Sequence, residues 1–155
     1  MVFSTLHTND AAGTIIRLEE MGVERFMVTS CVAAVLAQRL VRKVCPNCQE
    51  DVSISDEKRS LMAQEMDLSP ALMVPSFRKG MGCPECGGTG YRGRLGIFEL
   101  LPLNDSIQQG IIEGASRAEI NREALSEGMI SLKMDGLDKV RQGITTYEEV
   151  LRVTR

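Results

Sequence analysis

The sequence contains no tryptophan, and aromatic residues make up only 4% of its 155 positions. It has no basic excess either, because 18 Lys and Arg residues against 21 Asp and Glu residues give a net charge of −3. Proteins that bind nucleic acid through its phosphates carry clustered cations that release counterions on binding. The composition therefore argues against a nucleic-acid partner. With nine methionines and few aromatics, it predicts an aliphatic, Met-rich core.

Long apolar runs are also missing. The longest, Cys31 to Ala37, is far shorter than the roughly 20 residues that a membrane-spanning helix requires. The first residues lack the basic segment of a secretory signal peptide, and polar Ser4 and Thr5 follow too early. Five cysteines in a chain without an export signal favour a reducing compartment, where paired cysteines serve metal or redox chemistry. We therefore expect a cytoplasmic protein.

A nucleotide-binding loop of the type G-x-x-x-x-G-K-[ST] is absent. The five lysines are followed by Val44, Arg59, Gly80, Met134 and Val140, never by Ser or Thr. No apolar run that ends in Asp forms a convincing Walker B strand. We therefore expect that this chain alone does not hydrolyse nucleotide.

Hydrophobic periodicity and capping residues predict a mixed α/β chain. Ser116 and Glu119 have the spacing of a capping box, in which each side chain accepts from the backbone amide of the other residue. Thr145 and Glu148 repeat this spacing before the last helix. The predicted strands are residues 1–6, 38–44 and 97–101, and the predicted helices are residues 10–22, 24–36, 56–66, 104–114, 116–128, 131–143 and 145–153.

The opening strand has no earlier element to pair with, which suggests a fragment excised from a longer protein. In the predicted helix over residues 24–36, Phe26, Met27 and Cys31 fall on an apolar face. Cys31 is therefore expected to be a core residue.

Two Cys-x-x-Cys motifs, Cys45–Cys48 and Cys83–Cys86, are the strongest chemical signal. Each motif can aim two sulfurs at one point, and two motifs complete a tetrahedral four-cysteine site. The 34 residues between them exceed the usual spacing of about 15–20, but doubling a loop costs only about 0.6 kcal/mol. Structural zinc is the favoured interpretation. Thioredoxin-like dithiols and an empty site are the alternatives.

Two other classes of protein use similar motifs. The pattern from Cys83 to Gly90 matches the C-x-x-C-x-G-x-G knuckle of DnaJ-type chaperones, but those domains repeat it four times and no glycine follows Cys48. A zinc-ribbon nucleic-acid module is disfavoured because residues 83–103 carry no basic excess. A zinc-knuckle binding or chaperone module therefore stays a minor alternative.

His7 is the only histidine, and it lies between a predicted strand and a predicted helix. At such a junction, backbone N–H groups and short polar side chains can face an anion. His7 is therefore a candidate phosphate-sensing residue, and an ordinary loop histidine among capping residues is the alternative.

Several segments resemble the GspE/PilB family of secretion ATPases, and they keep the family's order over nearly the whole chain. Residues 4–11 (STLHTNDA) resemble its His box. Residues 37–48 and 82–101 resemble the two flanks of its tetracysteine motif, and residues 135–140 and 143–154 resemble its C-terminal end. The family consists of hexameric cytoplasmic ATPases that drive type II secretion or type IV pilus extension.

The resemblance implies a fold class and a division of the chain. The fold is α/β: the C-terminal part of a RecA-like P-loop motor domain, with an inserted four-cysteine zinc-knuckle subdomain and a C-terminal helical cluster. Residues 1–44 would end the ATPase core and include the His box. Residues 45–101 would form the zinc-binding subdomain, and residues 102–155 the helical subdomain.

The resemblance also implies a set of site residues. In the intact enzyme, His7 would respond to the γ-phosphate, with Thr8 and Asn9 beside the nucleotide. The zinc ligands would be Cys45, Cys48, Cys83 and Cys86. ATP and Mg²⁺ would bind only in the intact enzyme.

The resemblance finally implies partners. We expect a homohexamer that docks on the cytoplasmic face of an inner-membrane secretion or pilus platform, without nucleic acid. The protein would then be cytoplasmic and peripherally associated with the inner membrane. Type II secretion is slightly favoured as the function, and type IV pilus extension is the alternative.

Overall fold

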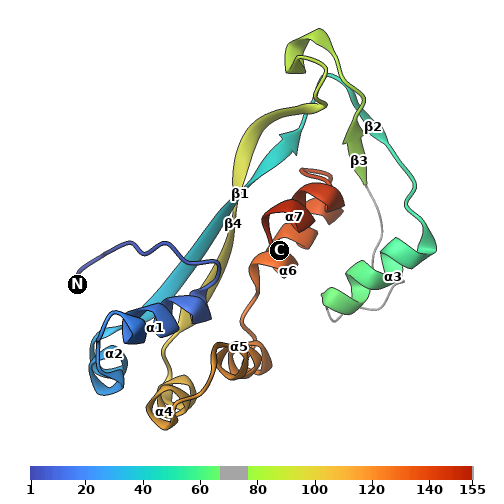
Figure 1. Cartoon of the computed structure of the whole chain (residues 1–155). Helices are drawn as coiled ribbons and strands as arrows, with labels where there is room; N and C mark the ends of the chain where they lie inside the picture. The colour runs from blue at the N-terminus through green and yellow to red at the C-terminus, as the bar shows by residue number, and fades with distance from the viewer. Residues whose placement is uncertain (67–76, 155) are drawn as a thin grey trace. The chain divides into compact units, whose positions relative to one another are not determined.

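The computed structural model describes residues 1–66 and 77–154 as a mixed α/β chain (Figure 1). The chain divides into two compact units, and each is built from two stretches of sequence. Unit 1 comprises Met1–Gln38 and Phe98–Ser131, and unit 2 comprises Arg39–Ile97 and Leu132–Arg155. Within the described ranges, every helix is too short or too polar to cross a bilayer.

Two long strands pass from one unit into the other. These strands, β1 (Ala34–Val44) and β4 (Tyr91–Pro102), pair in a two-stranded sheet. A second two-stranded sheet lies in unit 2, where β2 (Gln49–Asp51) pairs antiparallel with β3 (Arg78–Gly80). Both cysteine motifs are close in sequence to the ends of these strands. The first motif lies between β1 and β2, and the second lies between β3 and β4.

Unit 1 packs amphipathic helices around an apolar core. Ile15 and Ile111 are fully buried, because α1 and α4 each turn an apolar stripe inward, and Leu101 of β4 is buried in the same core. The helices of this unit are α1 (Ala11–Glu20), α2 (Arg25–Cys31), α4 (Asp105–Glu113) and α5 (Arg117–Ser126).

Unit 2 carries the cysteine motifs and the last two helices. Leu137 and Val140 are buried, as the helical periodicity predicts. The helices of this unit are α3 (Asp56–Glu65), the short 3-10 helix η2 (Pro84–Cys86), α6 (Leu132–Arg141) and α7 (Tyr147–Val153).

Gly136 lets α6 and α7 pack closely. A Cβ atom added at Gly136 would lie 2.7 Å from Cγ1 and 3.0 Å from Cγ2 of the fully buried Val150. We expect Gly136→Ala to lower the free energy of unfolding by about 1–3 kcal/mol, because overpacking outweighs the better helix propensity of alanine. Urea denaturation measures this change.

The matched control is Gly110→Ala in α4. A Cβ atom there would meet Ala115 Cβ at 3.6 Å, which is an ordinary contact. Alanine should therefore raise the free energy of unfolding by up to about 1 kcal/mol. Equal changes in the two variants would contradict the role given to close packing at Gly136.

Predicted helix starts that depend on local capping are confirmed. Ser116 Oγ accepts from the amide of Glu119, and the carboxylate of Glu119 accepts from the amide of Ser116 at 2.8 Å. Asp10, Ser55 and Asn104 each cap the helix that follows them. These contacts join residues three positions apart, so they are readable from the sequence.

Predictions near the N-terminus are wrong in part. Residues 1–6 form no strand, because strand geometry is stabilised by pairing and no described strand pairs with them. The second helix ends at Cys31, since Val32 is already extended and β1 begins at Ala34 to pair with β4. Cys31 is exposed rather than part of the core, and Phe26 on the same helix is 69% exposed.

The last helix begins one residue later than predicted. Thr146 is its N-cap and accepts from the amide of Glu149 at 3.3 Å. Thr145 instead donates its hydroxyl to the carbonyl of Arg42 at 2.8 Å, a contact 103 residues away in sequence. The predicted N-cap at Thr145 is therefore wrong, because a long-range contact takes the first threonine.

Candidate metal centre and N-terminal loop

The four predicted ligand cysteines converge in unit 2. All four Sγ atoms lie within 4.8 Å of one another. The Sγ–Sγ distance is 3.9 Å for Cys45 and Cys83, 3.9 Å for Cys48 and Cys86, and 3.7 Å for Cys83 and Cys86. A tetrahedron with metal–sulfur bonds of about 2.3 Å has sulfur–sulfur edges of about 3.8 Å. The cluster therefore fits a four-coordinate metal ion held by thiolates.

Glycines shape the backbone around this cluster. Gly87 and Gly88 have φ values of +60° and +78°, which side-chain-bearing residues rarely adopt. The backbones of Gly80 and Gly90 pass so close that a Cβ atom on either would collide with the carbonyl oxygen of the other. This close approach closes the loop that carries the second motif. The first motif is joined to that loop by two backbone hydrogen bonds, from the N–H of Cys45 to the carbonyl of Gly90 at 2.9 Å and from the N–H of Met81 to the carbonyl of Cys48 at 2.9 Å.

Backbone amides point at two of the sulfurs. Cys86 Sγ accepts from the N–H groups of Cys83 at 3.2 Å and Gly90 at 3.3 Å. Cys48 Sγ accepts from the N–H of Gly82 at 3.3 Å. Four thiolates around a divalent ion carry a formal charge of −2, so donors of this kind stabilise the loaded site.

The four thiols and the nearby amides share protons in the metal-free cluster. Burial raises the pKa of Cys86, but hydrogen bonds from the N–H groups of Cys83 and Gly90 and from the Cys83 and Cys48 thiols lower it to about 6. Burial raises the pKa of Cys48 to about 12, together with hydrogen bonds to the other three thiols and against the N–H of Gly82. Binding of a cation to the four thiolates therefore releases protons, so metal affinity depends on pH.

A buried carboxylate fixes the elements beside the cluster. Glu149 on α7 is only 2% exposed, and it accepts from Arg42 Nε at 3.0 Å, from Arg42 Nη2 at 2.8 Å and from the Arg42 backbone N–H at 3.0 Å. Arg152 Nη2 donates to the same carboxylate at 2.6 Å. The Arg42 guanidinium lies 4.3 Å from the centre of the Tyr91 ring, and Tyr91 directly follows the cluster's donor Gly90. This network ties α7 to both long strands.

No sequence pattern predicted this network. Its signal was weak, because Glu149 stands among charged residues and its partner Arg42 is 107 residues away. The capping-box spacing pointed instead to its exposed neighbour Glu148. Glu148 pairs with Lys58 at 2.9 Å.

The residues of the predicted His box lie in unit 1, in the segment before α1. His7 and Asn9 are exposed, and Thr8 is half-buried. Thr8 Oγ1 donates to the carbonyl of Asp10 at 3.1 Å and lies 2.7 Å from Thr14 Oγ1. The turn that follows His7 is therefore anchored to the first turn of α1.

Two carboxylates occupy amides at the N-terminus of α1. Asp10 Oδ1 accepts from the N–H of Gly13 at 2.7 Å, and Glu99 Oε1 accepts from the N–H of Ala11 at 2.8 Å. An anion would compete with these carboxylates for the same donors. Two amides of this helix N-terminus are therefore already occupied, whereas the side chain of His7 is exposed.

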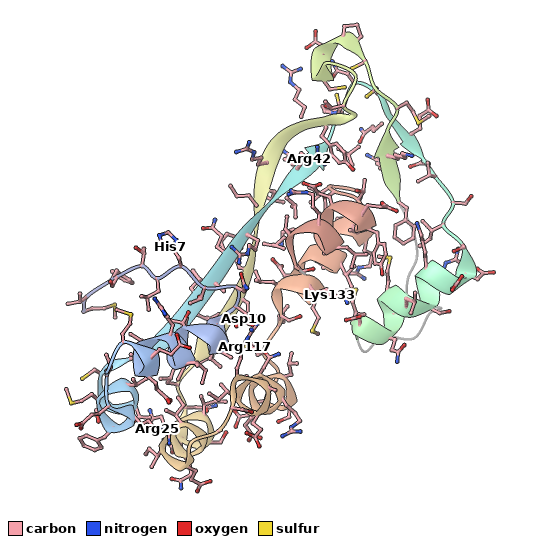
Figure 2. All side chains as sticks on the ribbon, in the orientation of Figure 1. His7, Asp10, Arg25, Arg42, Arg117 and Lys133 are labelled. Carbon is pink, nitrogen blue, oxygen red and sulfur yellow. The ribbon has the colours of Figure 1, made fainter. Side chains whose placement is uncertain are left out.

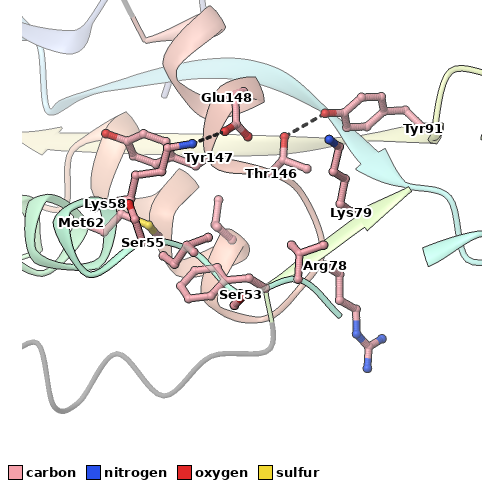
Figure 3. A pocket seen from close by; sticks show the side chains of 14 residues that line it. Ser53, Ser55, Lys58, Met62, Arg78, Lys79, Tyr91, Thr146, Tyr147 and Glu148 are labelled. Atoms are coloured by element: carbon pink, nitrogen blue, oxygen red, sulfur yellow. Dashed lines mark hydrogen bonds and ion pairs between the residues drawn. The ribbon is translucent and has the colours of Figure 1, made fainter. Parts of the chain in front are cut away.

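A cavity of about 550 Å³ in unit 2 is the other candidate for anion binding (Figure 3). Its lining includes Lys58, Arg78 and Lys79. However, Lys58 pairs with Glu148 at 2.9 Å, and Arg78 Nε lies 3.5 Å from Asp51. With two of the three cations neutralised, the cavity has little attraction for a phosphate.

The comparison with protein families identifies the class of protein. The family model described as Type II/IV secretion system protein matches residues 1–152. The chain belongs to this family.

Several curated relatives are similar over the whole chain. The Type IV pilus assembly ATPase PilB of Thermus thermophilus is 49% identical over 155 residues, which cover 99% of this chain and 17% of the relative. The Type II secretion system protein E of Dickeya dadantii is 44% identical, and the Type II secretion system ATPase E of Vibrio cholerae is 43% identical. Each of these two matches covers 100% of this chain and 30% of the relative. The chain thus spans less than a third of the length of these relatives.

Proposed function

We propose that this chain forms the C-terminal part of a RecA-like ATPase motor that powers type II protein secretion. The observation that carries the proposal is the family match over residues 1–152, together with relatives that bear the name ATPase. Type IV pilus extension is the second candidate, and the 49% identity to a pilus assembly ATPase favours it. Assays of exoprotein secretion and of pilus formation in a strain that lacks the gene distinguish the two functions.

We infer that the ion held by the cysteine cluster is zinc. The donor set supports this, because four thiolates in tetrahedral spacing are typical of structural zinc sites. Such a site has no open position for water or substrate, so it does not perform catalysis. Its role is to hold the two motifs together and so to close the segment between Cys48 and Cys83.

We also propose the organisation that the resemblance implies. In sequence order, residues 1–44 end the ATPase core, residues 45–101 form the zinc-binding subdomain, and residues 102–155 form the helical subdomain. The two compact units do not follow this order, because their boundaries fall after Gln38, Ile97 and Ser131. In the intact protein, ATP and Mg²⁺ are bound by parts of the core outside this chain. The intact protein is a cytoplasmic homohexamer that docks on an inner-membrane secretion or pilus platform.

His7 contributes to ATP hydrolysis by donating a hydrogen bond to the γ-phosphate. Phosphoryl transfer depends on positioning and on stabilising charge in the transition state, and other groups of the intact enzyme supply most of both. Thr8 and Asn9 lie beside His7 and complete the loop. The anchoring of Thr8 to Asp10 and Thr14 supports this role, because it limits the movement of the loop.

The test is His7→Ala in the full-length enzyme. We expect kcat to fall about 100-fold with little change in the KM for ATP, because the lost donor acts mainly in the transition state. His7→Gln, which keeps an N–H donor, should recover part of kcat. Unchanged turnover in His7→Ala would make His7 an ordinary loop histidine.

A second measurement tests whether the catalytic groups lie outside this chain. We expect the 155-residue chain alone to show no Mg²⁺-dependent ATP hydrolysis, since it has no phosphate-binding loop. Robust hydrolysis by this chain, after removal of any contaminating ATPase, would contradict the assignment of the catalytic groups to the rest of the protein.

A further inference from the structure

One carboxylate in unit 1 joins the start of α1 to the start of α5. Asp10 caps α1 through Gly13, and the same side chain accepts from Arg117 Nε at 2.9 Å and from Arg117 Nη2 at 2.5 Å, both at Oδ2. Arg117 is the first residue of α5. Figure 2 shows Arg117 beside Asp10, below the segment that carries His7. Charge-assisted pairs with two donors fix geometry as well as distance.

Gly13 leaves the space that this pair occupies. A Cβ atom at Gly13 would lie 2.8 Å from Asp10 Oδ1 and 3.7 Å from Arg117 Nε. Glycine inside a helix is about 1 kcal/mol less favourable than alanine. A residue with a side chain would therefore improve α1 itself but would displace the carboxylate. The ion pair between Arg117 and Asp10 thus depends on the missing side chain at Gly13, unlike an ordinary surface ion pair.

The pair is linked to the loop by a short chain of contacts. The backbone carbonyl of Asp10 accepts from Thr8 Oγ1 at 3.1 Å and from Thr14 Oγ1 at 3.4 Å. Thr8 is the residue directly after His7. The Asp10 residue that Arg117 holds by its carboxylate thus also anchors the His7 loop by its backbone carbonyl.

We propose that Arg117 is a positioning residue for the loop formed by His7, Thr8 and Asn9. It holds the carboxylate of Asp10, Asp10 holds Thr8, and Thr8 sets the direction in which the chain leaves His7. This inference rests on the proposed function, in which His7 meets the γ-phosphate. Arg117 touches no substrate, so it acts only through the loop.

The matched control is Arg25, which lies on α2 in the same unit (Figure 2). Its Nε atom donates to Glu19 at 3.1 Å, and its side chain is 47% exposed, against 54% for Arg117. Arg25→Ala therefore removes an ion pair of similar exposure that does not contact the His7 loop.

The first test uses the 155-residue chain and needs no activity. We expect the amide of Gly13 to exchange with solvent about 3- to 10-fold faster in Arg117→Ala than in Arg25→Ala, because the Asp10 carboxylate that accepts from this amide loses its own anchor. Gly13→Ala should have a similar effect by displacing Asp10. Equal exchange in the two arginine variants would overturn the proposal.

The second test uses the full-length enzyme. We expect Arg117→Ala to lower kcat about 10-fold with the KM for ATP unchanged, because small displacements of a catalytic loop slow turnover. Arg117→Lys should recover part of kcat, since lysine keeps the charge but not the planar pair of donors. Arg25→Ala should leave kcat unchanged. If Arg117 only stabilised the fold, Arg117→Ala and Arg25→Ala would show the same loss of folded protein.

These outcomes separate the two claims. If His7→Ala lowers kcat and Arg117→Ala does not, the positioning role is wrong and the proposed function stands. If His7→Ala leaves kcat unchanged, the role of His7 in hydrolysis is wrong, and the exchange rates still decide whether Arg117 holds the Asp10 carboxylate that caps α1.

Discussion

Replacing Cys86 with serine is expected to abolish stable metal binding and to loosen the cysteine region of unit 2. The unsubstituted chain, purified without added metal, should contain about one zinc ion per molecule, measured by elemental analysis. Structural zinc sites contribute on the order of 10 kcal/mol of binding free energy, which is also folding free energy. We therefore expect chelation, or the loss of one thiolate, to lower the stability of this region by several kcal/mol.

The loss of the metal should loosen one region of the chain rather than the whole chain. Amide exchange should accelerate in β2 and β3 and around the two motifs, because the metal holds these segments together. Helices α4 and α5 belong to unit 1 and should change little. A uniform acceleration over the whole chain would contradict a local role for the metal.

Cys31→Ser is the matched control for the Cys86 variant. It makes the same chemical change at an exposed cysteine that lies outside the cluster. Metal content and stability should stay as they are in the unsubstituted chain. A metal content near zero in the unsubstituted chain, with all four cluster thiols freely titratable, would defeat the zinc assignment.

Glu149→Gln is expected to destabilise the protein by roughly 3 kcal/mol at neutral pH, because the buried side chain loses the charge that strengthens its hydrogen bonds from two guanidinium groups. Burial would raise the pKa of Glu149, but hydrogen bonds from Arg152 and Arg42 outweigh it and lower the pKa from its ordinary 4.5 to about 2. A shift of this size corresponds to roughly 3 kcal/mol of stability.

The lowered pKa of Glu149 gives the sign of the pH dependence. The unfolded chain binds the proton more tightly, so the contribution is complete above pH 4.5 and is lost as the pH falls toward 2. Urea denaturation over this range should show a steeper loss in the unsubstituted chain than in Glu149→Gln. The difference between the two curves isolates the carboxylate, because acid release of the metal affects both proteins.

Glu148→Gln is the control for this prediction. Its side chain is 65% exposed and pairs with Lys58 on the surface, so its loss should cost at most about 1 kcal/mol. Equal losses for the two neighbouring glutamates would contradict the importance of the buried network.

Features that depend on nearby residues were predictable from the sequence. The cysteine cluster follows from two motifs whose internal spacing fixes where each pair of sulfurs points. The caps at Asp10, Ser55, Asn104 and Ser116 follow from side chains that reach amides three residues away. The place of His7 before the start of α1 made it a candidate for phosphate contact, the family resemblance favoured that role, and the role stays a proposal.

Features that depend on distant residues were not predictable. The partners Arg42 of Glu149 and Arg117 of Asp10 lie 107 residues away in each case, and no local pattern points to either contact. The helix expected over residues 24–36 was cut short because pairing between β1 and β4 overrides local helical spacing. The strands β2 and β3, of three residues each, are too short to show a hydrophobic period.

The discontinuous build of the two units has a consequence for how the chain can be divided. The polypeptide passes between the units three times, after Gln38, Ile97 and Ser131, and two of these passages lie inside β1 and β4. A single proteolytic cut therefore releases neither unit as one continuous piece. For the same reason, one crossover between two related genes cannot exchange a whole unit. Chimaeras that swap only unit 1 or only unit 2 need breakpoints inside both β1 and β4. The joined sequences must then still allow these two strands to pair.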